Sequence, residues 1–215
     1  MIEIKSKREI ELMREASKIA SQTQKRVEEL IRPGISTIEL DRAAEKFIRE
    51  NDAIPAQKNF PHYEKGVAPF PATLCISIND VVIHGIPSKK IILNEGDIVS
   101  VDLVVLKNGF HGDCARTYIV GETSPEAKKL VDITKQAFYE GIKFAKSGNR
   151  IGDISHAIGE FVNKNGYSVV REFEGHGIGR QMHEEPEVPN YGKAGKGARL
   201  VPGMTIAVEP MVIMG

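Results

Sequence analysis

The sequence predicts an α+β protein of two related halves, each with helices followed by antiparallel strands. Three observations predict this class: apolar stripes that open on helix-capping boxes, a strong β-hairpin signal, and a weak internal repeat. With 215 residues, 41% of them hydrophobic, the chain is long enough to bury a core of its own. We therefore expect one domain over residues 1–215, with internal halves of about 1–122 and 123–215.

Composition argues against several classes of function. Lys plus Arg equal Asp plus Glu at 29 each, so the net charge of zero supports neither a nucleic-acid nor an anionic-membrane partner. The charged N-terminus lacks the apolar core of a signal peptide, and no apolar run reaches the length of a membrane span. Cys75 and Cys114 form no CxxC motif, which favours free thiols and a cytoplasmic location.

Two helices are expected at the start of the chain. Residues 6–9 have the spacing of a capping box, and an apolar stripe follows until Pro33-Gly34 ends the helix. Residues 36–39 form a second box, which opens a helix to about Glu50.

Strands are expected in the rest of the first half. Residues 53–71 are rich in proline and aromatic side chains and lack periodicity, so we expect a loop there. Alternating side chains predict a strand over 73–79 and a short one over 81–85. Two β-branched runs then flank Asn108-Gly109, which predicts a hairpin over Val99–Val120.

The second half again begins with helices. Ser124-Pro125 opens a long helix to about Lys146, residues 147–149 break it, and another helix reaches about Asn165.

An internal repeat connects the halves. Residues 33–53 and 147–167 match at four positions with one offset, and Asp102 with the six residues before it aligns with Glu209 and the six before that. Because both matches occur in the same order, a duplication is the better interpretation, although short matches also arise by chance. The repeat gives Glu209 the place that Asp102 has in the first half.

The hairpin carries two aspartates on one face. If Asn108-Gly109 is the loop, Val104 faces Asp113 and Asp102 faces Ala115, so the two carboxylates are diagonal neighbours. Bare anions among apolar side chains are costly to bury, which favours a divalent cation between them. The alternative is a half-exposed sheet whose aspartates face water.

A glycine-rich stretch, EGHGIGRQMHEEP, supplies two histidines. His176 and His183 lie seven residues apart among glycines that let a backbone approach closely. We interpret them as functional because the chain already holds an unexplained aspartate pair; a structural role is the alternative. His84 is either functional or a surface residue at the end of a strand.

Four of these residues form a candidate metal set: Asp102, Asp113, His176 and Glu209. A set of carboxylates with one imidazole suits Mn, Fe, Co or Zn better than a thiolate site would, and such sets commonly hold two ions.

Three motifs, VDLVVLKNGFHGDCART, GHGIGRQMHEEPEVPNY and PGMTIAVEP, resemble those of the bacterial-type (type I) methionine aminopeptidases. The likeness extends from the first helix to Gly215. It implies the pita-bread fold, in which two pseudo-symmetric halves with antiparallel sheet covered by helices close over a dinuclear metal site. It also implies an enzyme that hydrolyses N-terminal methionine from peptides and nascent proteins, whose N-termini are its partners.

The resemblance assigns roles to residues of this sequence. The implied metal ligands are Asp102, Asp113, His176 and Glu209. Glu209 would also take the proton of the attacking water and pass it to the leaving amine, while His84 and His183 flank the substrate as catalytic and binding residues. The implied lining of the methionine pocket is Phe70, Cys75 and Met182, the last in place of a commoner Phe.

The chain departs from the family pattern near its end. The family has a fifth ligand, a bridging Glu on a strand beyond Glu209, and the repeat likewise shows no counterpart of Asp113 before Gly215. We interpret the chain either as truncated, with its C-terminal strand region missing, or as a variant with an incomplete site. We then expect one occupied or weakly occupied metal position, low or absent activity, and self-association through an open strand edge over 205–213.

Two alternatives remain open. An Xaa-Pro peptidase of the same fold usually carries an extra N-terminal domain, for which this chain has no room, and the run HEEPEVPNY favours the methionine enzyme. A metal-poor, non-catalytic pita-bread binding protein belongs to another class; four ligand residues argue against it, and the missing fifth keeps it open. Metal analysis beside a Met-peptide cleavage assay discriminates these alternatives.

Overall fold

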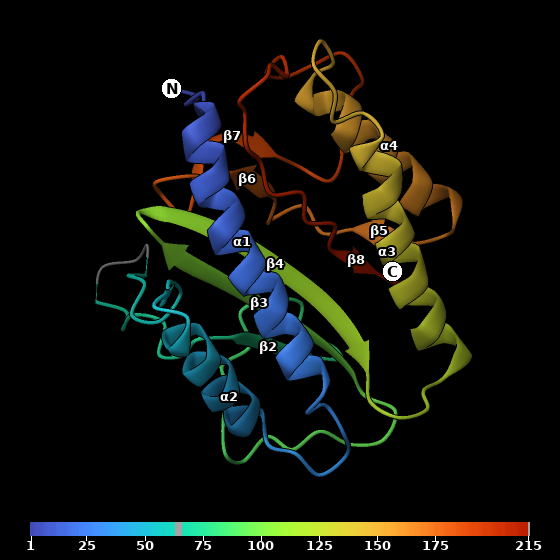
Figure 1. Ribbon diagram of the computed structural model, residues 1–215. Helices are drawn as coiled ribbons and strands as arrows, with labels where there is room; N and C mark the ends of the chain where they lie inside the picture. The colour runs from blue at the N-terminus through green and yellow to red at the C-terminus, as the bar shows by residue number, and fades with distance from the viewer. Residues whose placement is uncertain (63–65, 215) are drawn as a thin grey trace. The chain divides into compact units, whose positions relative to one another are not determined.

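The computed structural model describes residues 1–62 and 66–214, and it mixes helices and strands as the sequence predicts (Figure 1). Residues 63–65, which fall in the predicted loop 53–71, and Gly215 lie outside the described residues. The chain divides into two compact units, one of residues 11–124 and one of residues 1–10 with 125–215. No helix in the described residues combines the length and the apolar character that a membrane span needs.

Within the described residues, the unit of residues 11–124 is an antiparallel sheet with two helices. Its elements are α1 (Lys7–Glu28, which begins in the other unit), α2 (Thr37–Glu50), β1 (Ile54–Pro55), β2 (Cys75–Ile78), β3 (Ile98–Lys107) and β4 (Phe110–Ile119). Strand β3 is central: β4 pairs along its whole length, and β1 and β2 pair with separate stretches of it. Strand β4 occupies one edge of β3, so β1 and β2 lie one after the other along the opposite edge of β3.

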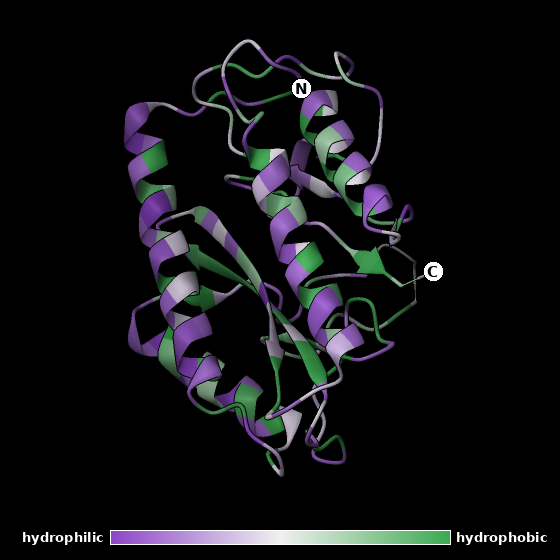
Figure 2. Cartoon of the chain, turned by 90° about the vertical axis from the view of Figure 1, so that its right-hand side faces the viewer, coloured by the Kyte–Doolittle hydropathy of each residue, from purple (hydrophilic) through white to green (hydrophobic). Residues whose placement is uncertain are grey.

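Alternation along β3 separates a core face from a polar face. Val99, Val101, Leu103 and Val105 are buried in a core that also contains the apolar stripes of α1 and α2. The helices carry both hydrophilic and hydrophobic residues along their length in Figure 2, as expected for helices with one buried side. The face of β3 opposite the core carries Asp102.

Helix α1 and β4 are in close contact at Gly112. A Cβ atom at this position would overlap the backbone nitrogen of Ser17 and the carbonyl carbon of Ala16. The backbones of helix and strand can therefore lie this close only because residue 112 has no side chain. Gly112 directly precedes Asp113 in the chain.

In its described part, the unit of residues 1–10 and 125–215 contains two helices and two small sheets. Its elements are α3 (Pro125–Ile142), α4 (Ile151–Lys164), β5 (Ser168–Val169), β6 (Gly175–Gly177), β7 (Glu184–Val188) and β8 (Val212–Ile213). Strands β5 and β8 pair antiparallel, as do β6 and β7. Their core joins Ala137 of α3 to the apolar face of α4 and to Val169 and Val188.

The local structure repeats where the sequence repeats. Gly34 and Gly148 both have positive φ, 87° and 99°, and their N–H groups donate to the carbonyls of Leu93 and Leu200. Each glycine is followed after three residues by a helix of 14 residues, α2 or α4. The strand pairs β1–β3 and β5–β8 occupy corresponding positions after these helices.

Two predicted strands are wrong. Residues 81–85 form none, because His84 has a φ of 58° in the left-handed region, which an extended strand does not accommodate. The span 205–213 is a strand only at Val212–Ile213, with an isolated bridge from Ile206 to Gly177. Pro210 lies between these pairings, and it has no N–H to donate to a ladder.

Predicted helix ends are also displaced. Helix α1 ends at Glu28, before Pro33-Gly34, because the N–H of Leu30 turns back to the carbonyl of Val27, three residues earlier. Helix α3 ends at Ile142, four residues before the predicted end.

Candidate metal centre

The hairpin register predicted from the sequence is confirmed. Strands β3 and β4 pair Val104 with Asp113 and Asp102 with Ala115. Both residues of the turn 108–109 have positive φ, 52° and 79°, as a type I′ turn requires. Asp102 and Asp113 are therefore half-buried diagonal neighbours on the polar face.

Gln24 of α1 holds the backbone beside both aspartates. Its side chain is buried, and Nε2 donates to the carbonyl oxygens of Val101 and Cys114, at 2.8 Å each. Val101 precedes Asp102, and Cys114 follows Asp113. A single helix side chain thus restrains the strand positions from which both carboxylates project.

Cys75 faces Asp102 from β2, as its direct partner in the register. Burial raises the pKa of the Cys75 thiol well above its usual range, and the negative charges of Asp102 and Asp113 raise it further. The thiol therefore stays protonated at neutral pH. A protonated thiol fits the predicted role in an apolar pocket and is unsuited to be a thiolate ligand or nucleophile.

His176 and Glu209 come together in the other unit. The segment before Glu209 runs beside β6, where the N–H of Ala207 donates to the carbonyl of His176 at 2.7 Å. Nδ1 of His176 lies 2.8 Å from the carbonyl of Gly177 and must donate, because a carbonyl only accepts. In the neutral ring Nε2 is then an acceptor, and it lies 3.2 Å from Oε1 of Glu209.

The spacing of these two atoms fits neighbouring ligands of one ion. Metal–nitrogen and metal–oxygen bonds of about 2.0–2.2 Å place adjacent ligand atoms roughly 3.0–3.5 Å apart. Oε1 of Glu209 is buried without a hydrogen-bond partner in the described part of the chain, which is costly unless a cation meets it. The alternative is a proton on Nε2 that makes an ion pair. The donor types and the orphaned oxygen fit a divalent metal.

His183 lies beside His176. The two rings are nearly perpendicular, at 87°, with centroids 4.5 Å apart. His183 ends the loop between β6 and β7 and is exposed, whereas His176 lies on β6. The His183 imidazole is therefore exposed to solvent directly beside a candidate ligand.

A buried ion pair anchors the residue after His183. Nζ of Lys5 contacts Oε2 of Glu184, with only 4% and 7% of the two side chains exposed. Oε1 of Glu184 also accepts the N–H of Gln181, at 3.0 Å. The N-terminal segment of the chain is thereby tied to the loop that carries His183.

The remaining predicted residues are placed as follows. His84 is exposed, and its neighbour Gly85 is bonded to β2 through the N–H of Ile76, at 2.8 Å. Phe70 is half-buried in the unit of residues 11–124, and Met182 is buried, at 5% exposed, in the other unit.

Four residues that support the candidate site were not predicted from the sequence: Lys5, Gln24, Gln57 and Asn190. Asn190 is fully buried and donates from Nδ2 to the carbonyl of Glu209 at 2.8 Å. All four act on partners far along the chain or across a turn, so local patterns gave no signal; only Asn190 stands inside a recognised motif, VPNY.

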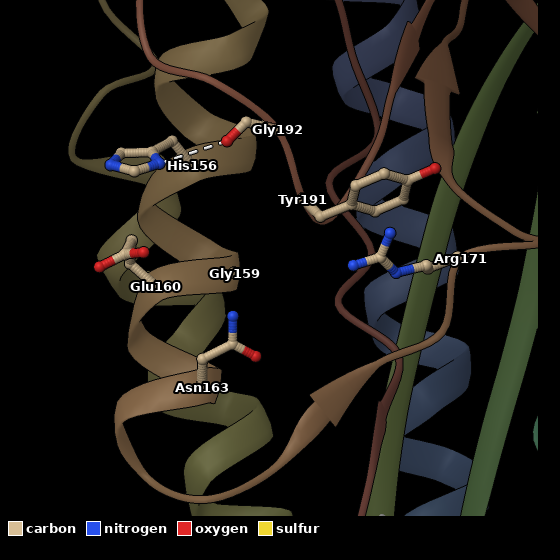
Figure 3. A pocket seen from close by; sticks show the side chains of 7 residues that line it. All are labelled: His156, Gly159, Glu160, Asn163, Arg171, Tyr191 and Gly192. Carbon is tan, nitrogen blue, oxygen red and sulfur yellow. Dashed lines mark hydrogen bonds between the residues drawn. The ribbon is translucent and has the colours of Figure 1, made fainter.

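A separate hollow of about 270 Å³ lies between α4 and the segments that carry Arg171, Tyr191 and Gly192 (Figure 3). The guanidinium of Arg171 stacks 4.7 Å from the ring centre of Tyr191, and Nδ1 of His156 lies 3.2 Å from the carbonyl of Gly192. The hollow contains none of the predicted site residues, and its lining is open and polar.

Comparison with known protein families shows which family has these features. Residues 11–215 match the description "Metallopeptidase family M24". The chain belongs to metallopeptidase family M24. Its two units, with antiparallel sheet and covering helices, have the pita-bread fold of that family, as predicted.

Relatives within family M24 are similar over the whole chain. A methionine aminopeptidase of Clostridium acetobutylicum is 53% identical over 215 residues, which are 100% of this chain and 83% of that protein. Methionine aminopeptidase 1 of Bacillus subtilis is 46% identical and is covered to 84%.

Solved structures agree with these relatives. A methionine aminopeptidase of Thermotoga maritima superposes with a TM-score of 0.95 at 41% identity, over 100% of this chain and 84% of that one. The prolidase of Pyrococcus furiosus gives a TM-score of 0.79 at 26% identity, over 96% of this chain and 57% of that one. The family M24 member described here is thus more similar to the first of these two enzymes.

Proposed function

We propose that this chain is a metal-dependent aminopeptidase that hydrolyses the N-terminal methionine from peptides and nascent proteins. The observation that carries the proposal is the 3.2 Å approach of His176 Nε2 to the orphaned, buried Oε1 of Glu209 in a member of a metallopeptidase family. The methionine specificity rests on relatives up to 53% identical that are named methionine aminopeptidases.

Four residues are proposed as metal ligands: Asp102, Asp113, His176 and Glu209. The hairpin register supports the aspartates, and the repeat supports the equivalence of Asp102 and Glu209. This donor set suits Mn, Fe, Co or Zn. One occupied metal position is proposed.

The residues of the chain divide the chemistry between them. A bound divalent ion lowers the pKa of water, so that hydroxide is available near neutral pH. Glu209 accepts a proton from the attacking water and returns it to the leaving amine. His183 donates to the oxygen of the scissile carbonyl as negative charge develops there, and His84 positions the scissile amide.

The methionine side chain is proposed to occupy a pocket lined by Phe70, Cys75 and Met182. All three are apolar at neutral pH, because the Cys75 thiol keeps its proton. An unbranched thioether fits such a lining, and a carboxylate does not.

Substrate preference distinguishes methionine removal from the rival Xaa-Pro activity. We expect peptides that begin with Met to be cleaved several-fold faster than matched peptides that begin with Val, since each buried methylene contributes about 0.8 kcal/mol. Peptides that begin with Glu should be cleaved at least tenfold more slowly than Met-peptides, because a buried charge costs more. Kcat/KM for the three peptides, measured with added Mn²⁺ or Co²⁺, checks this. If Xaa-Pro dipeptides were cleaved faster than Met-peptides, the result would contradict methionine removal and favour the Xaa-Pro activity.

His183 is expected to act on the transition state and not on the metal. His183→Ala should lower kcat by about 10²-fold or more, the scale of losing one oxyanion donor, while bound metal is retained. His156→Ala, a matched change on α4, should keep the wild-type rate. Loss of metal from His183→Ala would show that His183 is a ligand instead.

Three further features are proposed on the same basis. The two halves form one catalytic domain, and the free thiols of Cys75 and Cys114 suit a cytoplasmic location.

The third feature is self-association through β8. In the described residues β8 belongs to a two-stranded sheet, and its Ile213 is 38% exposed. An edge of this kind can pair with a second copy, which sedimentation analysis would detect as a dimer.

A further inference from the structure

Strands β1 and β2 approach one another beside Asp102. Strand β1 pairs with β3 at Val105 and Leu106, and the N–H of Ala56 extends the pairing to the carbonyl of Val104, at 2.8 Å. Strand β2 pairs with the next stretch of β3, which begins at Asp102. The next residue after Ala56, Gln57, therefore reaches β3 at the point where the two strands meet.

Gln57 is buried there, with 8% of its surface exposed. Nε2 donates to Oδ2 of Asp102 at 2.8 Å and lies 3.5 Å from Sγ of Cys75. The orientation of the amide follows from chemistry, since a carboxylate oxygen needs a donor. Oε1 points the other way and, within residues 1–62 and 66–214, has no hydrogen-bond partner.

The arrangement has an energetic cost that packing alone would not require. A buried acceptor without a partner costs about 1–3 kcal/mol, and an apolar side chain of the same length would avoid that cost. The amide is explained if its N–H group supplies a hydrogen bond that Asp102 requires and that an apolar side chain could not donate.

We propose that Gln57 is a positioning residue, which holds Oδ2 of Asp102 so that the carboxylate keeps one orientation for a divalent cation. The inference rests on the proposed function, because it takes Asp102 as a ligand. Hydrogen bonds from outer groups to ligating carboxylates fix the direction of the lone pairs, and their loss typically weakens metal binding by about 10–100-fold.

The test compares Mn²⁺ binding by calorimetry with peptide cleavage in the same proteins. Gln57→Met keeps the length and removes the donor, whereas Gln57→Asn keeps the amide but cannot reach Asp102. Gln22→Glu, at an exposed position of α1, is the matched control. Circular dichroism checks that each variant is folded.

Both Gln57 variants are expected to bind Mn²⁺ about 10–100-fold more weakly than wild type, with KM for a Met-peptide nearly unchanged at saturating metal. In an Asp102→Asn background, Gln57→Met should weaken binding no further, because the two changes act through one carboxylate. A purely structural role would instead give additive losses.

Wild-type affinity in both variants, or additive losses in the double variant, overturns the positioning role. Failure of the wild-type protein to bind Mn²⁺ and to cleave Met-peptides is a different result, which would contradict the proposed function itself. The comparison of wild type with variants therefore separates the two failures.

Discussion

Asp113→Asn is expected to abolish cleavage of Met-peptides and to lower the bound metal, while the helical circular dichroism stays unchanged. The substitution keeps the shape of the side chain and removes its charge, so the hairpin pairing with Val104 persists. Loss of a ligand removes several kcal/mol of transition-state stabilisation, which corresponds to a rate lower by about 10²–10⁴-fold.

The measurement is metal content by atomic emission together with kcat/KM. Asp132→Asn is a matched control, because Asp132 lies on the surface of α3 with 63% of its side chain exposed. Unchanged metal content and rate in Asp113→Asn would refute the assignment of the hairpin face as a metal-binding face.

Lys5→Met is expected to lower the free energy of unfolding at pH 7 by about 3–5 kcal/mol, because it leaves the carboxylate of Glu184 buried without its cation. Equilibrium unfolding in urea measures this loss. Lys7→Met, at an exposed position two residues later, should change stability by less than about 0.5 kcal/mol.

The effect of Lys5→Met depends on pH in a direction set by Glu184. Burial opposes ionisation of this carboxyl, but the hydrogen bonds from Lys5 and from the N–H of Gln181 outweigh it and lower its pKa. A lowered pKa contributes stability above the unfolded pKa, and that contribution is lost as the pH falls through the folded value. The difference in free energy of unfolding between wild type and Lys5→Met should therefore become smaller on acidification from pH 7 toward pH 4. An equal difference at pH 7 and pH 4 would contradict the pairing of Lys5 with Glu184.

The sequence predicted the elements whose local signals are strong. The turn at 108–109 set the hairpin register, because both residues tolerate positive φ and a one-residue slip would reverse every face. The second capping box placed α2 at its observed bounds, Thr37–Glu50. Elements with weaker signals, such as the span 205–213, were wrong where one residue without an N–H interrupts the pairing.

The supporting residues of the site could not be predicted in this way. Gln24 and Gln57 are polar side chains that enter buried positions next to strands far along the sequence. Their partners are set by how helix and strands pack, which no local periodicity records. The proposed aspartate ligands could be singled out from the sequence because acidic residues in apolar strands are conspicuous, whereas a buried amide in a helix or after a strand is not.

Gly112 shows that sensitivity to mutation and chemical participation are different properties. Any side chain at this position would force α1 away from β4 and shift the neighbouring Asp113. A complete substitution scan scored by activity would therefore rank residue 112 beside the acidic residues, although it has no functional group. A map of tolerated substitutions in this enzyme would therefore mark positions where a side chain has no room as well as positions that take part in the chemistry. The free energy of unfolding measured on each variant would distinguish the two, because an overlap at residue 112 strains the fold whereas Asp113→Asn leaves it intact.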